Sequence, residues 1–106
     1  MVKVAVFVRL EVKRGKEADM EKLLCGGLDM ALQEEATPVW LSLRIGPSTF
    51  GIFDAFVDEE GRQSHLSGPI AAALMKQAKD LLKEPPVIEM MDVLAAKLPR
   101  KAAEKK

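Results

Sequence analysis

The sequence predicts an α+β fold, a ferredoxin-like antiparallel sheet with the element order β-α-β-β-α-α-β. Four segments alternate apolar and polar residues with the period of a strand, and two others repeat apolar residues at helical spacing. The 106 residues are enough for one hydrophobic core and too few for two. We therefore expect one domain over residues 1–98, with helices covering one face of the sheet, and a basic tail over residues 99–106.

The first strand and the first helix have the clearest patterns. Residues 2–12 begin with Val2, Val4, Val6 and Val8 at every second position, which predicts a strand with one apolar face. Residues 17–35 repeat apolar side chains at intervals of three or four, which predicts a helix. Gly26 and Gly27 in its middle each cost about 1 kcal/mol relative to alanine. This pair predicts a kink or a close approach between the helix and the sheet.

A hairpin is expected in the middle of the chain. Thr37-Pro38 ends the first helix, and strands are predicted over residues 39–45 and 50–57. Because about four residues separate these strands, they should pair directly. Asp58 is a suitable N-cap for a short helix over residues 59–66.

The last two elements are a helix and a strand. Pro69 is suited to the first turn of the next helix, whose apolar stripe consists of Ile70, Leu74, Ala78 and Leu81. Glu84-Pro85-Pro86 ends this helix, and residues 87–98 predict the final strand.

The two faces of the sheet should differ in their surroundings. The valine side of the first strand is expected to face the helices. The other face would then hold Phe7, Arg9, Trp40, Ser42 and Arg44, joined by Ile52, Asp54 and Phe56 if the hairpin register allows. A register shift of one residue would exchange the two sets. Because an aromatic face is unstable in water, we expect a partner sheet or a ligand to cover it, which favours a homodimer.

Composition and charge exclude several classes of function. Sixteen basic and sixteen acidic residues cancel, so we expect no nucleic-acid partner. No apolar run is long enough to cross a bilayer, and the first residues read as a strand, so we expect no membrane segment and a cytoplasmic location. Cys25 is the only cysteine, which excludes an intrachain disulfide, and we expect it to fill a small buried space on the first helix.

The segment from Phe53-Asp54-Ala55-Phe56 through an acidic turn to His65-Leu66-Ser67-Gly68-Pro69 resembles the antibiotic biosynthesis monooxygenase-like family. Asp54 stands where the family usually has Glu, Phe56 where it has Trp, and His65 at the first of two histidines, with Ile70 at the second. The element order matches over residues 2–98. The resemblance implies a dimeric α+β barrel.

The resemblance also implies an activity. Oxidoreductases of this family let a phenol or quinol reduce dioxygen directly, so no metal, flavin or other cofactor is required. A cofactor-independent monooxygenase acting on a small hydroxylated aromatic is therefore one hypothesis. The alternative is a non-catalytic homodimer that binds or shelters a small apolar molecule.

The candidate site residues each have two interpretations. His65 and Asp54 are the candidate catalytic pair, because His65 is the only side chain that titrates near neutrality, although it could instead fix the corner between two helices. Arg9, Trp40, Arg44 and Phe56 are the candidate substrate-binding residues. An Arg9–Asp54 ion pair would equally explain those charges, and core or dimer contacts would explain the two aromatic rings. One histidine and one cysteine are too few for a metal site, and no phosphate-binding glycine motif occurs.

Overall fold

The computed structural model describes residues 1–99, so the predicted tail lies outside the described residues except for Pro99. The predicted element order is confirmed. The elements are β1 (Val4–Glu11), α1 (Glu17–Leu32), β2 (Val39–Arg44), β3 (Thr49–Phe56), α2 (Glu59–Leu66), α3 (Pro69–Leu81) and β4 (Val87–Asp92).

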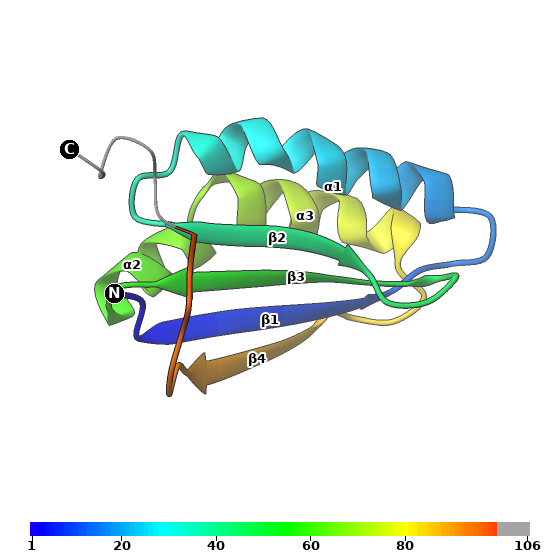
Figure 1. Cartoon of the computed structure of the whole chain (residues 1–106). Coiled ribbons are helices and arrows are strands. Elements are labelled where there is room, and N and C mark those ends of the chain that lie inside the picture. The colour runs from blue at the N-terminus through cyan, green and yellow to red at the C-terminus, as the bar shows by residue number, and fades with distance from the viewer. Residues whose placement is uncertain (100–106) are drawn as a thin grey trace.

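The four strands form one antiparallel sheet in the order β2-β3-β1-β4. Figure 1 shows α1 and α3 side by side along one face of this sheet, with α2 at the end where β3 finishes. This arrangement is the ferredoxin-like α+β fold that the sequence predicts. Within residues 1–99, none of the helices has the length and apolar composition needed to span a bilayer.

Two elements end earlier than the sequence predicts. Helix α1 ends at Leu32, after which the chain turns and the Thr37 N–H bonds to the Glu34 carbonyl at 3.1 Å. Strand β4 ends at Asp92, with one further bond of 2.8 Å from the Val93 N–H to the Lys3 carbonyl. Because β1 begins at Val4, residues beyond Val93 find no continuing strand to pair with.

The hydrophobic core lies between the valine side of β1 and the helices. Its buried members on β1 are Val6, Val8 and Leu10, and the helices contribute Met20, Leu24, Leu74 and Leu81. The predicted close approach of helix and sheet is confirmed at Gly27, where an added Cβ would lie 3.3 Å from the Trp40 ring. Gly26 beside it faces open space.

The assignment of side chains to the two sheet faces is corrected by the hairpin register. Trp40 pairs with Asp54, and Asp54 pairs with Val6 on its other side. Directly opposed residues point to the same face, so the helix-facing side of β2 and β3 holds Trp40, Ser42, Arg44, Phe50, Ile52, Asp54 and Phe56. The N–H groups of Ile45 and Gly46 both bond to the Thr49 carbonyl, which fixes this register.

The opposite side of the sheet, here called the open face, is nevertheless apolar. Phe7 lies there as predicted and pairs with Phe53, which in turn pairs with Leu41. Leu41 is 50% exposed and Leu43 38% exposed. Gly51 leaves room for the Phe7 ring, since an added Cβ would lie 2.9 Å from that ring. The open face is therefore an uncovered apolar surface in the single chain.

The expected role of Cys25 is wrong, because this residue is exposed. The buried side of α1 carries Met20, Leu24 and Ala31. Position 25 follows Leu24 by about 100° of helix rotation, which turns it away from the core.

Candidate functional site

A pocket lies between α3 and the sheet, on the helix-facing side. This inner pocket has a volume of about 300 Å³. Its lining is mostly apolar and comes from all four strands and two helices: Val8, Trp40, Ile52, Asp54, His65, Leu66, Ile70, Ala71, Leu74, Met75, Pro86, Ile88 and Met90. Met75, Ile88 and Met90 are about half exposed, so the pocket opens between α3 and β4.

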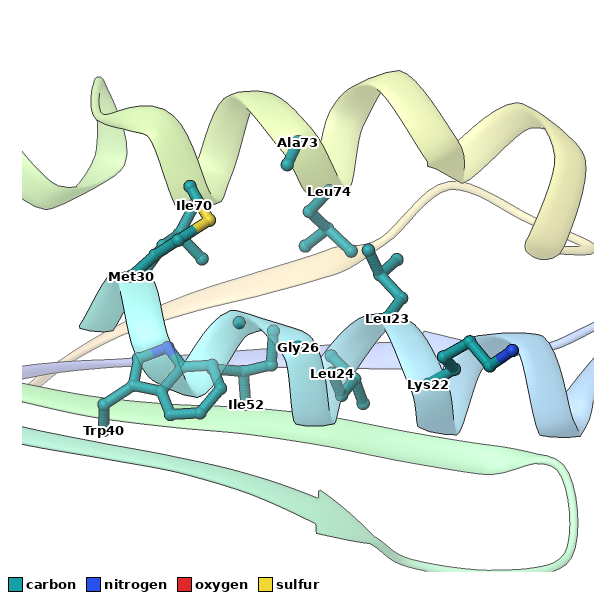
Figure 2. A pocket seen from close by; sticks show the side chains of 11 residues that line it. Lys22, Leu23, Leu24, Gly26, Met30, Trp40, Ile52, Ile70, Ala73 and Leu74 are labelled. Atoms are coloured by element: carbon teal, nitrogen blue, oxygen red, sulfur yellow. The ribbon is translucent and has the colours of Figure 1, made fainter. Parts of the chain in front are cut away.

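A second hollow of about 290 Å³, here called the side hollow, lies between α1 and α3. Figure 2 shows Leu23 and Leu74 pointing toward one another across it, with the Trp40 ring on the side of the sheet. The side hollow shares Trp40, Ile52, Ile70 and Leu74 with the inner pocket. These shared walls make the space under α3 large enough for a small aromatic molecule.

The short helix α2 places His65 at the inner end of this space. Asp58 caps the helix as predicted, accepting a hydrogen bond of 2.8 Å from the Gly61 N–H. The His65 side chain is 5% exposed, and its Nε2 lies 2.7 Å from Oδ2 of Asp54 on β3. The capped helix α2 therefore positions His65, and strand β3 positions Asp54.

The other ring nitrogen of His65 has a second carboxylate partner. Its Nδ1 lies 2.7 Å from Oε1 of Glu34, in the turn that follows α1. The Thr37 hydroxyl donates to the same Glu34 oxygen at 2.9 Å and is itself buried. The imidazole is thus held between two carboxylates from distant parts of the chain.

This geometry fits a protonated imidazole ring. A neutral imidazole has one N–H, whereas both nitrogens of His65 face carboxylate oxygens at hydrogen-bond distance. Burial alone would lower the pKa of His65, but the hydrogen bonds to Asp54 and Glu34 outweigh burial and raise it. Burial raises the pKa of Asp54, and the contact with His65 opposes that effect only in part. The Phe56 ring packs against the imidazole with the two ring centroids 5.4 Å apart.

Two buried polar atoms, on residues that line the inner pocket, have no hydrogen-bond partner among residues 1–99. They are Oδ1 of Asp54 and Nε1 of Trp40, both buried. The two residues are direct neighbours across β2 and β3 and line the same pocket. A hydroxyl group can accept one hydrogen bond and donate another, so it carries both the acceptor that the Trp40 N–H lacks and the donor that Oδ1 of Asp54 lacks.

The structure brings together four of the six predicted site residues. Asp54, His65 and Trp40 line the inner pocket, and Phe56 lies fully buried against His65. The hypothesis that Arg9 pairs with Asp54 is wrong, because Arg9 lies on the open face and its Nε is 2.9 Å from Glu11.

Arg44 also lies away from the inner pocket. It faces the helices near the far end of β2, where it pairs with Glu21 at 2.6 Å and stacks 4.6 Å over the Phe50 ring. The contact with Glu21 links β2 to α1 at the protein surface.

Glu34 and Thr37 are site residues that the sequence analysis missed. Glu34 is 31 positions from His65 along the chain and lies in a polar segment at a helix end. A buried histidine needs hydrogen-bond partners for both ring nitrogens. This requirement is the one feature that could have indicated a second polar partner for His65. In the part of the chain that the structure describes, no cluster of three His, Cys, Asp or Glu side chains is suited to hold a metal ion.

Comparisons with known proteins find a relative of 55% identity and more distant structures of the same fold. No protein-family model and no curated protein match the chain. The crystal structure of NE2512, a protein of unknown function from Nitrosomonas europaea, is 55% identical, with 95% of this chain and 98% of that chain covered and a TM-score of 0.92.

More distant structures share the fold. The SO0527 protein of Shewanella oneidensis is 15% identical, with 87% of this chain and 91% of that chain covered and a TM-score of 0.77. The crystal structure of an antibiotic biosynthesis monooxygenase is 13% identical, with 87% of this chain and 99% of that chain covered and a TM-score of 0.76. The fold resemblance seen in the sequence is thereby confirmed.

Proposed function

Because the chain belongs to the same family as NE2512 of Nitrosomonas europaea and has the antibiotic biosynthesis monooxygenase-like fold, we propose that it is a cofactor-independent monooxygenase. Its substrate would be a small hydroxylated aromatic compound or quinol. The relative at 55% identity has no known function, so the proposal depends on the site of this chain.

The observation that carries the proposal is the pair of unpartnered atoms on Trp40 and Asp54. A buried polar group without a partner costs about 1–3 kcal/mol, which a ligand hydroxyl would recover at both atoms. The remaining walls of the inner pocket are almost wholly apolar and suit an aromatic ring. The two features together select a ring that carries a hydroxyl.

In the proposed reaction, Asp54 and His65 handle the proton of the bound hydroxyl. The Trp40 N–H donates to the hydroxyl oxygen, while the hydroxyl donates to Oδ1 of Asp54. Proton transfer to Asp54 makes the ring electron-rich, so the ring itself can reduce dioxygen. For a phenol, one oxygen atom enters the ring at a C–H position and the other leaves as water, giving a quinone. The aromatic ring supplies all the electrons that reduce dioxygen, so the reaction needs no cofactor.

We also propose that the protein works as a homodimer in the cytoplasm. The apolar open face, with Leu41, Leu43 and Phe7, supports a partner sheet, because single chains rarely leave such a surface in water. A second copy of this chain offers the same surface through a two-fold axis.

Oxygen consumption with a panel of hydroquinones and naphthols tests the activity. We expect uptake of one dioxygen per quinone formed, and a decrease of about 10²–10⁴-fold in rate for Asp54→Asn. Glu35→Gln is the matched control and should keep the native rate, because Glu35 lies outside the inner pocket. Absence of uptake with every compound would contradict the proposal.

The alternative of a non-catalytic binding protein makes a different prediction. Its support is the apolar character of the inner pocket and the side hollow, which could hold a small molecule without chemistry. Tight binding of the same aromatics without oxygen uptake would favour it.

A further inference from the structure

The contacts around His65 continue past the inner pocket to a separate opening. A third cavity of about 240 Å³, here called the outer hollow, is lined by Glu34, Glu35, Ala36, Thr37, Ser64, His65, Gly68 and Pro69. Among the described residues, His65 alone lines both the outer hollow and the inner pocket. His65 is therefore the residue that the two cavities share.

Each ring nitrogen of His65 lies beside one carboxylate. On the inner side, Nε2 lies 2.7 Å from Oδ2 of Asp54, a residue that lines the inner pocket and whose other oxygen is buried without a described partner. On the outer side, Nδ1 lies 2.7 Å from Oε1 of Glu34. Thr37 orients that carboxylate through its 2.9 Å hydrogen bond. The side chains form a continuous line of hydrogen bonds from the buried pocket to the outer hollow.

We propose that Asp54, His65 and Glu34 form a proton relay, which lets a proton leave the inner pocket through the outer hollow while the substrate remains bound. The proposal rests on the proposed function for the origin of the proton. Thr37 is a positioning residue that holds Glu34 against the ring.

The relay step moves one proton in and one proton out. A substrate hydroxyl gives its proton to Oδ1 of Asp54. Because a neutral Asp54 no longer stabilises the imidazolium, His65 releases its Nδ1 proton to Oε1 of Glu34, which passes it to water in the outer hollow. The three groups carry the same total charge before and after, and the reverse step returns a proton to the inner pocket.

The groups that face His65 support proton movement from the inner pocket toward the outer hollow. The described side chains within hydrogen-bond distance of the ring nitrogens are Asp54, Glu34 and Thr37. The Glu34 side chain is 19% exposed, whereas that of Asp54 is 2% exposed. Glu34 is therefore the member that meets water.

Exchange of the His65 ring protons with water tests the relay without any substrate. The chain has one histidine, so ¹⁵N-histidine labelling gives a single set of ring resonances. In the native protein we expect the Nδ1 proton to exchange with water and the rate to rise with the concentration of a small buffer base such as formate. Glu34→Gln keeps an acceptor for the Nδ1–H but cannot take up the proton, so exchange should slow at least about tenfold.

Two further variants complete the test. Glu35→Gln changes a carboxylate that lines the same outer hollow but is not among the described hydrogen-bond partners of His65, and it should leave the rate unchanged. Glu34→Asp retains a carboxylate and should restore part of the exchange; it also serves if Glu34→Gln fails to fold.

Equal exchange rates in the native protein and Glu34→Gln, or equal slowing by Glu35→Gln, would overturn the relay. Because no substrate is present, these results are independent of oxygen uptake. A protein with no oxygenase activity but normal Glu34-dependent exchange would contradict the proposed function alone.

Discussion

The Nε2 atom of His65 lies 2.7 Å from Oδ2 of Asp54, and both side chains are almost completely buried. This contact joins the end of α2 to the middle of the sheet at the inner pocket. Removing either partner leaves a buried polar group without its counterpart, so the contact influences stability as well as chemistry.

The contact predicts a specific dependence of stability on pH. The pKa of His65 is raised above 6.5, so the folded chain binds its proton more tightly than the unfolded chain does. The stabilisation is complete below pH 6.5 and is lost as the pH rises through the raised pKa. The free energy of unfolding should therefore fall over this range. Urea unfolding at fixed protein concentration across this pH range measures it.

The control for this prediction is His65→Gln, which removes the titrating group. This variant should lose about 1–3 kcal/mol of stability below pH 6.5, because Asp54 and Glu34 lose a charged donor. Its stability should then change little across the same range. An identical pH dependence in the native chain and in the variant would show that another group is responsible.

Adjacent glycines on α1 provide a matched pair of substitutions. Gly26→Ala adds a methyl group in open space and should raise the free energy of unfolding by about 0.5–1 kcal/mol. Gly27→Ala places the same methyl group 3.3 Å from the Trp40 ring, so the ring must shift. This variant should be less stable than Gly26→Ala and should alter the emission of the only tryptophan. Equal stabilisation by both changes, with unchanged emission, would contradict the close packing.

The open face predicts an obligate dimer. Leu41→Lys places a charge on this surface, on the edge strand β2, and should give a monomer or an unfolded chain. Leu32→Lys is the control, because Leu32 is 74% exposed at the end of α1 and lies away from the open face.

Sedimentation and thermal melting measure the dimer. Such an interface commonly buries about 2,000 Å² or more, and the melting temperature of the native protein should rise with its concentration. A well-folded native monomer at micromolar concentration would contradict the prediction.

The element order could be predicted from the sequence, but which side chains lie on which face of the sheet could not. Alternation along β2 separates two sets of side chains, but it does not show which set faces the helices. The apolar set with Leu41 and Leu43 lies on the open face, while Ser42 and Arg44 face the helices. If burial of apolar side chains alone decided the arrangement, Leu41 and Leu43 would face the helices and Ser42 and Arg44 would lie on the open face. The backbone bonds of the hairpin turn decide the register, and residue type predicts those bonds poorly.

The candidate site was predictable only where its residues lie close together in the sequence. Asp54 and His65 belong to one strand–helix segment, so the resemblance to a family could identify both. Glu34 reaches His65 only because the turn after α1 folds back against α2. Arg9 cannot pair with Asp54, because Asp54 lies opposite Val6 and Arg9 is three residues further along β1. An odd number of residues along a strand places two side chains on opposite faces of the sheet.

We propose that the inner pocket binds an aromatic ring through its hydroxyl, between Trp40 and Asp54. The most direct measurement compares the dissociation constants of 2-naphthol and naphthalene for the native protein and for Trp40→Phe. Naphthalene is the more hydrophobic of the two, so a preference for naphthol reports the polar contacts. We predict that the native protein binds naphthol about tenfold more tightly than naphthalene, and that Trp40→Phe loses most of this preference. Equal affinities in the native protein, or a preference that Trp40→Phe leaves intact, would contradict this mode of binding.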